Sequence, residues 1–179
     1  MQMAAATKQW TLEELHSLPD DGNKYELIRG ELFVTPAPTD HHETIAARLA
    51  RLLDPYVATQ GLGFVYRPRA ILRREGSEVE PDLMVRQPQP DRRATWDQAP
   101  LPLLIVEILS DSTRRRDREH KRDFYLDVGV AEYWIVDPEG RTITSIVRGR
   151  DDVVAADRIT WSPAGAAAAL TVEVADVFG

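Results

Sequence analysis

One seven-residue run constrains the fold more than any other part of the sequence. Residues 103–109 read Leu-Leu-Ile-Val-Glu-Ile-Leu, with no alternation of polar and apolar side chains. A continuous apolar run of this length is typical of a central β-strand that is buried on both faces. We therefore expect a sheet covered by other elements on both sides, with one carboxylate, that of Glu107, in its interior.

Helix and strand patterns surround this run. Thr11 and Glu14 form a capping pair that predicts a short helix over residues 11–18. Asp40 and Glu43 predict the start of an amphipathic helix whose apolar residues are Ile45, Leu49, Leu52, Leu53 and Tyr56. A third helix is expected over residues 113–128. The expected strands are 63–72, 79–85, 103–109 and 170–174, with hairpins over 24–34 and 132–147.

This order of elements predicts an α/β (α+β) domain, a mixed β-sheet flanked by helices. The length of 179 residues favours one domain, here residues 11–179 after an N-terminal tail of residues 1–10. The chain has no cysteine, which excludes disulfides, cysteine–zinc sites and a thiol nucleophile. No apolar run is long enough to cross a membrane, and no secretory signal is present, so we expect a cytoplasmic protein.

The charge distribution limits the kind of partner. A formal net charge of −7 argues against a protein that coats nucleic acid without specificity. Residues 114–122, however, hold six basic residues against two acidic ones. Such a basic stripe on an acidic body suits a site that touches one short stretch of nucleic-acid backbone. The alternative is a solvated helix face.

Two carboxylates stand in unusual places. Glu107 lies within the buried run, where an unpaired charge costs several kcal/mol unless a partner or a metal compensates it. Asp82 follows Pro81 at the entry to the strand expected over residues 79–85. Carboxylates on neighbouring strands can hold one Mg²⁺ together with waters and a substrate phosphate. The alternatives are an arginine partner for Glu107 and a turn role for Asp82.

Lys121 shares a helix face with apolar residues. Lys121, Phe124, Tyr125 and Val128 are spaced so that they lie on one side of a helix. The lysine should thus face the sheet, where Asp82 and Glu107 are the nearest carboxylates expected. There it could stabilise charge that develops on a phosphate. The alternative is a lysine at the edge of the stripe whose ammonium reaches solvent.

These residues belong to an ordered set of motifs that runs from Thr11 to Phe178. The set resembles the Uma-type "putative restriction endonuclease" family of the PD-(D/E)xK nuclease superfamily. The segments that carry the resemblance are Tyr25–Leu32 (YELIRGEL), Pro36-Ala37-Pro38 with His42, Pro81-Asp82-Leu83, Val106–Thr113 (VEILSDST), Lys121 with Tyr125, and Gly129–Pro138 (GVAEYWIVDP).

The resemblance implies a restriction-endonuclease-like fold and a metal site. Asp82 and Glu107 would bind Mg²⁺ or Mn²⁺, and the backbone carbonyl of Ile108 would be a third ligand. The superfamily lysine normally lies two residues after the second acid, where this chain has Leu109. In this family the lysine has moved to the following helix, which matches Lys121.

Other residues have weaker indications. Glu26 resembles an extra upstream acid of such nucleases, although it could equally be a surface carboxylate that pairs with Lys24 or Arg29. His42 could orient a phosphate or transfer a proton, but a polar residue at a helix start is the favoured alternative. The stretch Ser110–Thr113 is predicted to cap the arginine-rich helix, whose N-terminus could also receive a phosphate.

The leading hypothesis from the sequence is a magnesium-dependent endonuclease that hydrolyses phosphodiester bonds in DNA. Its candidate catalytic residues are Asp82, Glu107, Lys121, Glu26 and His42. The alternative is a degenerate member of the fold that binds nucleic acid or a protein without cutting. A domain with one active site usually needs a second copy of itself to cut both strands of a duplex, so a homodimer is also expected.

Overall fold

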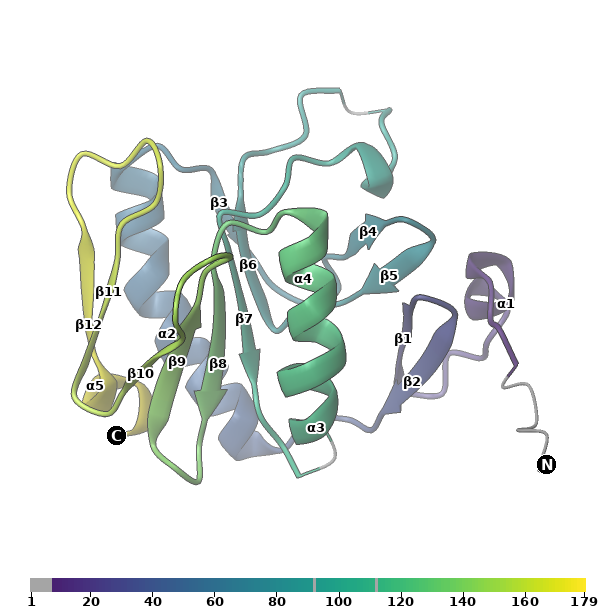
Figure 1. Ribbon diagram of the computed structural model, residues 1–179, viewed down its shortest axis with the longest axis horizontal. Coiled ribbons are helices and arrows are strands. Elements are labelled where there is room, and N and C mark those ends of the chain that lie inside the picture. Colours follow the sequence, from purple (N-terminus) through teal and green to yellow (C-terminus); the bar gives the residue numbers. More distant parts are fainter. Residues whose placement is uncertain (1–7, 92, 112) are drawn as a thin grey trace.

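A six-stranded mixed sheet forms the centre of the computed structural model, which describes residues 8–179 except 92 and 112 (Figure 1). The strand order is β10-β9-β8-β7-β6-β3. β7 and β8 are parallel, and the other neighbours are antiparallel. The strands are β3 (Phe64–Tyr66), β6 (Leu83–Arg86), β7 (Leu104–Ile108), β8 (Tyr133–Asp137), β9 (Thr142–Ile146) and β10 (Val153–Ala155).

The inner strand β7 is buried on both faces, as its sequence predicts. Val106 and Ile108 belong to one hydrophobic core, whereas Ile105 and Leu109 belong to a second core on the opposite face. Because side chains alternate along a strand, Glu107 lies on the face of Ile105 and Leu109. The carboxylate is therefore directed into the second core.

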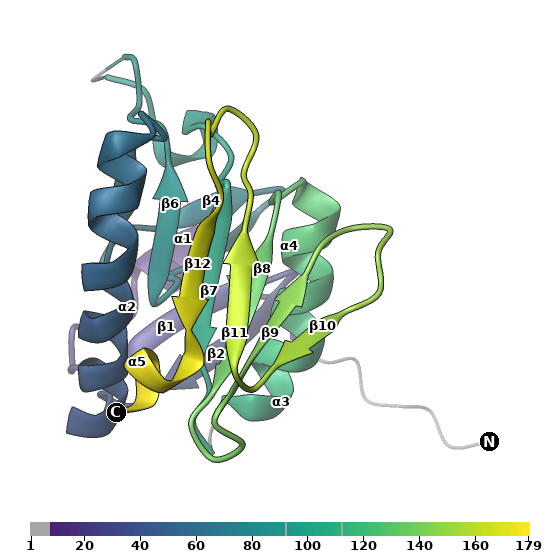
Figure 2. The ribbon, with the colours of Figure 1, turned by 90° about the vertical axis from the view of Figure 1, so that its left-hand side faces the viewer.

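Helix α2 (Asp40–Thr59) covers the first face of the sheet. Its buried residues Ile45, Leu49 and Leu53 recur at helical spacing and pack in the first core. A two-stranded sheet of β11 (Arg158–Trp161) and β12 (Leu170–Glu173) covers the remainder of this face, together with α5 (Val174–Phe178) (Figure 2).

The second face carries a continuous helical segment and a smaller sheet (Figure 1). The segment comprises α3 (Arg114–Arg116), a π-helical turn η2 (Asp117–Lys121) and α4 (Arg122–Val128). The smaller sheet has the order β2-β1-β5-β4. Its strands are β1 (Lys24–Ile28), β2 (Glu31–Thr35), β4 (Leu72–Arg74) and β5 (Ser77–Val79), and the short helices α1 (Leu12–His16) and η1 (Trp96–Gln98) complete the fold.

Several expected elements are confirmed. Thr11 and Glu14 form the predicted capping box of α1, and β1 and β2 form the hairpin that turns at Arg29-Gly30. The β8–β9 hairpin is also present, and Gly129 ends α4 in the left-handed conformation that glycine adopts readily. Tyr133 and Trp134 are core residues, as expected.

Other boundaries differ from the sequence prediction. The single strand expected over 63–72 is two strands, β3 and β4, in different sheets. The strand expected over 79–85 is likewise divided into β5 and β6. Pro81 lacks an amide donor and interrupts pairing, so Asp82 lies at the break between the two sheets. β10 and β11 were not expected.

The helix starts also differ. Thr39, not Asp40, caps α2, because its hydroxyl accepts the backbone N–H of His42. The expected helix 113–128 contains the π-helical turn.

Two predictions lie partly outside the described residues: the tail over residues 1–10, of which 1–7 are not described, and the cap over Ser110–Thr113, of which residue 112 is not described. Among the described residues, no helix has both the length and the apolar character needed to span a membrane.

Packing of α2 on the sheet should dominate stability. Leu49 is fully buried, so Leu49→Ala should lower the free energy of unfolding by about 2–5 kcal/mol, because it removes apolar burial and leaves a cavity. Urea unfolding measures this. Arg51→Ala, on the exposed side of the same helix, is the control and should change stability by less than about 0.5 kcal/mol. Equal effects would show that α2 does not pack as described.

Candidate active site

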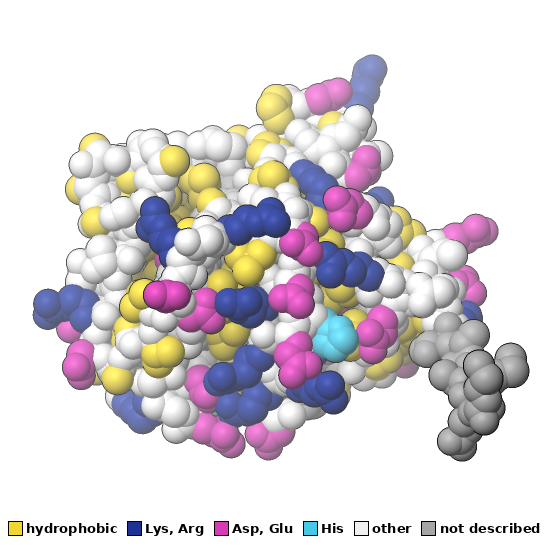
Figure 3. Space-filling model, viewed as in Figure 1, with side chains coloured by type: hydrophobic (Ala, Val, Ile, Leu, Met, Phe, Trp, Pro, Cys, Tyr) yellow, Lys and Arg dark blue, Asp and Glu magenta, His cyan; other side chains and the backbone are white. Residues whose placement is uncertain are grey.

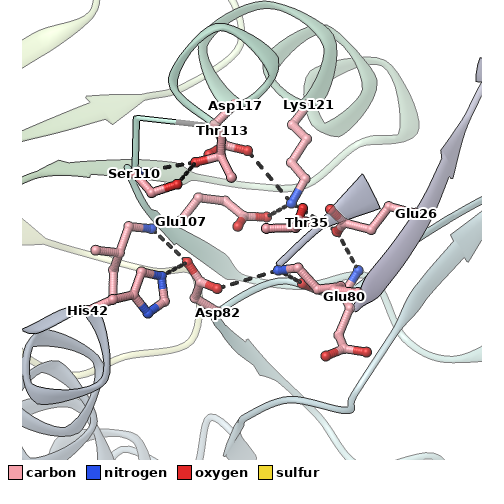
Figure 4. A network of polar contacts seen from close by, with 12 residues as sticks. Glu26, Thr35, His42, Glu80, Asp82, Glu107, Ser110, Thr113, Asp117 and Lys121 are labelled. Atoms are coloured by element: carbon pink, nitrogen blue, oxygen red, sulfur yellow. Dashed lines mark hydrogen bonds and ion pairs between the residues drawn. The ribbon is translucent and has the colours of Figure 1, made fainter. Parts of the chain in front are cut away.

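The register between β6 and β7 places the two predicted acids side by side. Leu83 pairs with Val106 in this antiparallel ladder. The next position along the same register sets Asp82 opposite Glu107, and residues opposite each other project to the same face. The two carboxylates are therefore neighbours, one just before the start of β6 and the other near the end of the adjacent strand β7 (Figure 4).

Asp82 is held by three groups from three elements. Its Oδ2 accepts the backbone N–H of Ile108 at 2.8 Å and Nε2 of His42, from α2, at 3.1 Å. The ammonium of Lys24, on β1, lies 3.6 Å from Oδ1. Burial disfavours the charged carboxylate, but His42 and Lys24 outweigh burial and hold the pKa of Asp82 far below its usual range.

His42 thus lies beside the predicted metal ligand and is more than a polar residue at a helix start. Its side chain is mostly buried. Burial favours the neutral imidazole, but the hydrogen bond and charge of Asp82 outweigh it and raise the pKa of His42. A protonated ring donates to Asp82 and orients that carboxylate.

The ammonium of Lys121 is completely buried among acids. It lies 2.7 Å from Glu107 Oε1, 2.9 Å from Glu26 Oε1 and 3.7 Å from Asp117 Oδ1. The exposed fraction of its side chain is 0%, so the alternative of an ammonium that reaches solvent is wrong. Burial would lower the pKa of Lys121, but Glu107 and Glu26 raise it.

The nearest carboxylates to Lys121 differ in part from those expected. Glu107 is confirmed, but the second close partner is Glu26 rather than Asp82. Glu26 is fully buried, so its interpretation as a surface carboxylate is wrong. The π-helical turn gives a wide turn between Asp117 and Lys121, and both residues are buried toward the sheet.

Glu26 and Glu107 share one ammonium but titrate differently. Burial raises both pKa values. Lys121, Lys24 and Arg116 together overcome this effect for Glu26 and lower its pKa to about 2. Glu107 has acidic neighbours in Asp82 and Asp117, and its pKa is raised to about 7. Glu107 therefore binds a proton more readily than Glu26 does.

A cleft of about 810 Å³ opens onto these groups. Its wall includes the start of α2, the β1–β2 hairpin, the loop before β4 and the end of β7. The predicted site residues in its lining are His42, Asp82, Glu107 and Ile108, and Lys24 lines it as well. Lys121 and Glu26 lie behind this wall.

The donor set suits a hard cation that takes few protein ligands. Among the described residues, no group of three or more His, Cys, Asp or Glu side chains is arranged to hold a metal. Mg²⁺ needs only one or two carboxylates and completes its shell with water and phosphate. Both hydrogen bonds to Glu107, from Lys121 and Tyr125, go to Oε1. Because Glu107 lines the cleft, its other oxygen is suited to a cation.

The arginine stripe does not form one free basic face. Arg114 pairs with Asp137 and Glu139, and Arg115 pairs with Glu119. Basic and acidic side chains alternate over this side of the molecule (Figure 3). Arg116 is buried, where it donates to the Thr35 hydroxyl at 2.6 Å and lies 3.4 Å from Glu26.

Sequence reasoning missed two residues of the network that it could have found. Lys24 lies two residues before Glu26 on the same strand, so both project to one face. Asp117 lies four residues before Lys121 and shares its side of the helix. No sequence pattern predicts the buried role of Arg116, because nothing in the sequence distinguishes it from the arginines beside it.

The fold is similar to that of a solved structure. The crystal structure of "a putative nuclease belonging to DUF820 from Anabaena variabilis ATCC 29413" matches with a TM-score of 0.79 and 20% sequence identity, over 94% of this chain and 97% of that chain. No curated protein matches the sequence. The chain therefore has a restriction-endonuclease-like fold.

Family membership follows from the sequence itself. Residues 12–175 match the Uma2 family, described as "Putative restriction endonuclease", and the chain belongs to this family. Fold and family together support a nuclease function.

The buried ammonium generates a pH-dependent prediction. Lys121→Met leaves Glu107 and Glu26 without their shared counter-ion, so stability near pH 7 should fall by about 3–5 kcal/mol. Burial already holds the pKa of Glu107 above its ordinary value, at about 7, and loss of the Lys121 charge raises it further, so at lower pH a proton on Glu107 replaces part of the lost ion pair. The loss should therefore be largest near pH 8 and shrink toward about pH 5, as urea unfolding at both pH values would show.

Arg122→Met is the matched control, because Arg122 is the next residue but pairs with Asp152 at the partly exposed surface. Its effect should be small and nearly independent of pH. An equal loss in the two variants at every pH would contradict the role assigned to the buried ammonium.

Proposed function

We propose that the chain is a magnesium-dependent endonuclease that hydrolyses phosphodiester bonds in DNA. The observation that carries the proposal is the meeting of Asp82 and Glu107 at the wall of the cleft, with Lys121 buried against Glu107. The family and the fold support nuclease chemistry, and the cleft supplies the place for it. Metal dependence and the choice of DNA are part of the proposal.

The residues present fit a metal at this position. Asp82, Glu107 and the backbone carbonyl of Ile108 would hold Mg²⁺ or Mn²⁺. The N–H of Ile108 donates to Asp82, and the carbonyl of the same residue lies on the same side of the strand. When bound, the cation would supply an activated water and stabilise charge on the phosphate.

The other residues act on the two ligands. His42 donates to Asp82 and holds its carboxylate in one orientation. Lys121 and Tyr125 both donate to Oε1 of Glu107 and leave its second oxygen for the cation. Glu26 is a second ion-pair partner of Lys121, and Arg116 and Lys24 compensate the charge of Glu26. The positioning residues for the two acids are thus His42, Lys121, Tyr125, Glu26 and Arg116.

The mouth of the cleft has cations that suit a phosphate backbone. Arg67 and Arg69 lie in its lining, and their side chains are 50% and 71% exposed. Their acidic partners are exposed as well, and such pairs contribute little and exchange readily. These arginines would neutralise phosphates on either side of the one being cleaved.

The test of the function is a cleavage assay on three substrates. Purified protein is incubated with plasmid DNA, single-stranded DNA and RNA, with Mg²⁺ or Mn²⁺ and with EDTA in parallel. The proposal expects nicked or linear plasmid with metal and intact plasmid with EDTA. Binding without cleavage under every condition would contradict it and favour the degenerate binding module. Linear product without a nicked intermediate would support the expected homodimer.

Metal binding itself gives a separate prediction. A cation that binds only the folded state stabilises it by about 2.7 kcal/mol at a free concentration of about 100 times its Kd. Mg²⁺ or Mn²⁺ should therefore raise the melting temperature of the wild-type chain, and Asp82→Asn should abolish this rise. The variant should remain folded, because the amide keeps the size of the side chain and one carbonyl acceptor.

Asp176→Asn, an exposed acid on α5, is the control and should keep the full metal response. A metal response that persists in Asp82→Asn would sink the ligand assignment.

A further inference from the structure

The chain has three lysines, Lys8, Lys24 and Lys121, and two of them contact the acids of the site. The ammonium of Lys121 has carboxylate oxygens at 2.7, 2.9 and 3.7 Å. Two of these oxygens are within hydrogen-bond distance and the third is an ion-pair partner, so the ammonium is enclosed by acids on the side away from the cleft. Because Lys121 is also absent from the lining of the cleft, it cannot contact a bound phosphate without leaving its partners.

Lys24, in contrast to Lys121, is accessible from the cleft. It lines the cleft, and its side chain is 20% exposed. Among the described residues, its ammonium makes one hydrogen bond, to the carbonyl of Glu80 at 3.0 Å. Asp82 Oδ1 is 3.6 Å away, which is an ion pair but too long for a hydrogen bond. Lys24 therefore has donors to offer on the cleft side of Asp82.

The sheet fixes Lys24 in this place. Lys24 pairs with Thr35 at the end of the β1–β2 hairpin, and Glu26, two residues later, is anchored by Lys121. A second anchor is the backbone N–H of Glu80, which donates to Glu26 at 2.9 Å. The same backbone that holds Glu26 behind the cleft thus presents Lys24 at its wall.

We infer that Lys24 is the catalytic lysine that contacts the reacting phosphodiester, whereas Lys121 is a positioning residue for Glu107. This inference rests on the proposed function and assigns a residue that neither the family motifs nor the position of the superfamily lysine indicates. A phosphate seated over Asp82 has Lys24 as its nearest accessible ammonium. The positive charge of Lys24 would stabilise the negative charge that develops on the phosphoryl oxygens.

The first test separates rate from binding. Lys24→Met should lower kcat by roughly 100-fold or more, as the loss of a donor to developing charge does. The Kd for a DNA duplex, measured with Ca²⁺ in place of Mg²⁺, should change much less. Lys24→Arg should recover part of the rate. Lys8→Met removes the same charge from an exposed lysine that does not line the cleft and should leave kcat unchanged.

The second test needs no turnover. Lysines are acetylated in the free protein and in its complex with a DNA duplex and Ca²⁺, and each site is quantified by mass spectrometry. Lys8 should react equally in both states, Lys24 should react in the free protein and be protected by DNA, and Lys121 should react in neither. Equal reactivity of Lys24 in both states, with DNA bound, would overturn the inference.

The outcomes also separate the inference from the function on which it rests. A wild-type chain that cuts DNA while Lys24→Met cuts equally well overturns the role of Lys24 and leaves the endonuclease in place. A wild-type chain that neither binds nor cuts DNA overturns both. A melting temperature for Lys24→Met within a few degrees of the wild-type value confirms that a lost rate is not a lost fold.

Discussion

The ion pair between Lys121 and Glu107 is the interaction on which the site depends. It joins the helical segment to the central strand, and Glu26 extends it to the smaller sheet. A buried pair of this kind gains little net stability over apolar residues, because desolvation of both charges offsets their attraction. Removal of one partner is costly, however, so the pair fixes the relative positions of the three elements. Such a constraint suits a site in which carboxylates must be held in one geometry.

The acids of the site have unequal electrostatic surroundings. Glu26 is surrounded by cations behind the cleft, whereas Glu107, at the cleft wall, has the acids Asp82 and Asp117 beside it. Positive charge brought to the cleft wall would thus relieve the repulsion between Glu107 and its acidic neighbours. In the proposed endonuclease, a divalent cation supplies this charge, and the two lysines have different roles. Lys121 keeps Glu107 in place, and Lys24 contacts the phosphate.

Much of the fold followed from local patterns. The continuous apolar run 103–109 predicted a central strand, and the spacing of Lys121 with Phe124 and Tyr125 predicted the buried face of the helix. The divided strands were missed because the choice between two sheets depends on tertiary pairing, which Pro81 interrupts but does not direct. The burial of Glu26 was undecided for a similar reason. Its environment comes from Lys121 and Arg116, about ninety residues further along the chain, and no local pattern contains that contact. The start of α2 was misplaced by one residue because Thr39 and Asp40 are both good caps.

The central claim is that Asp82, Glu107 and the carbonyl of Ile108 form a site for one divalent cation, with Lys121 behind it. A crystal of the wild-type chain soaked with Mn²⁺ tests this most directly, because anomalous scattering locates the metal without reference to activity. The account predicts an anomalous peak bounded by these three groups, with Lys121 still paired to Glu107. A peak bound elsewhere, or none here at a Mn²⁺ concentration that raises the melting temperature, would contradict it.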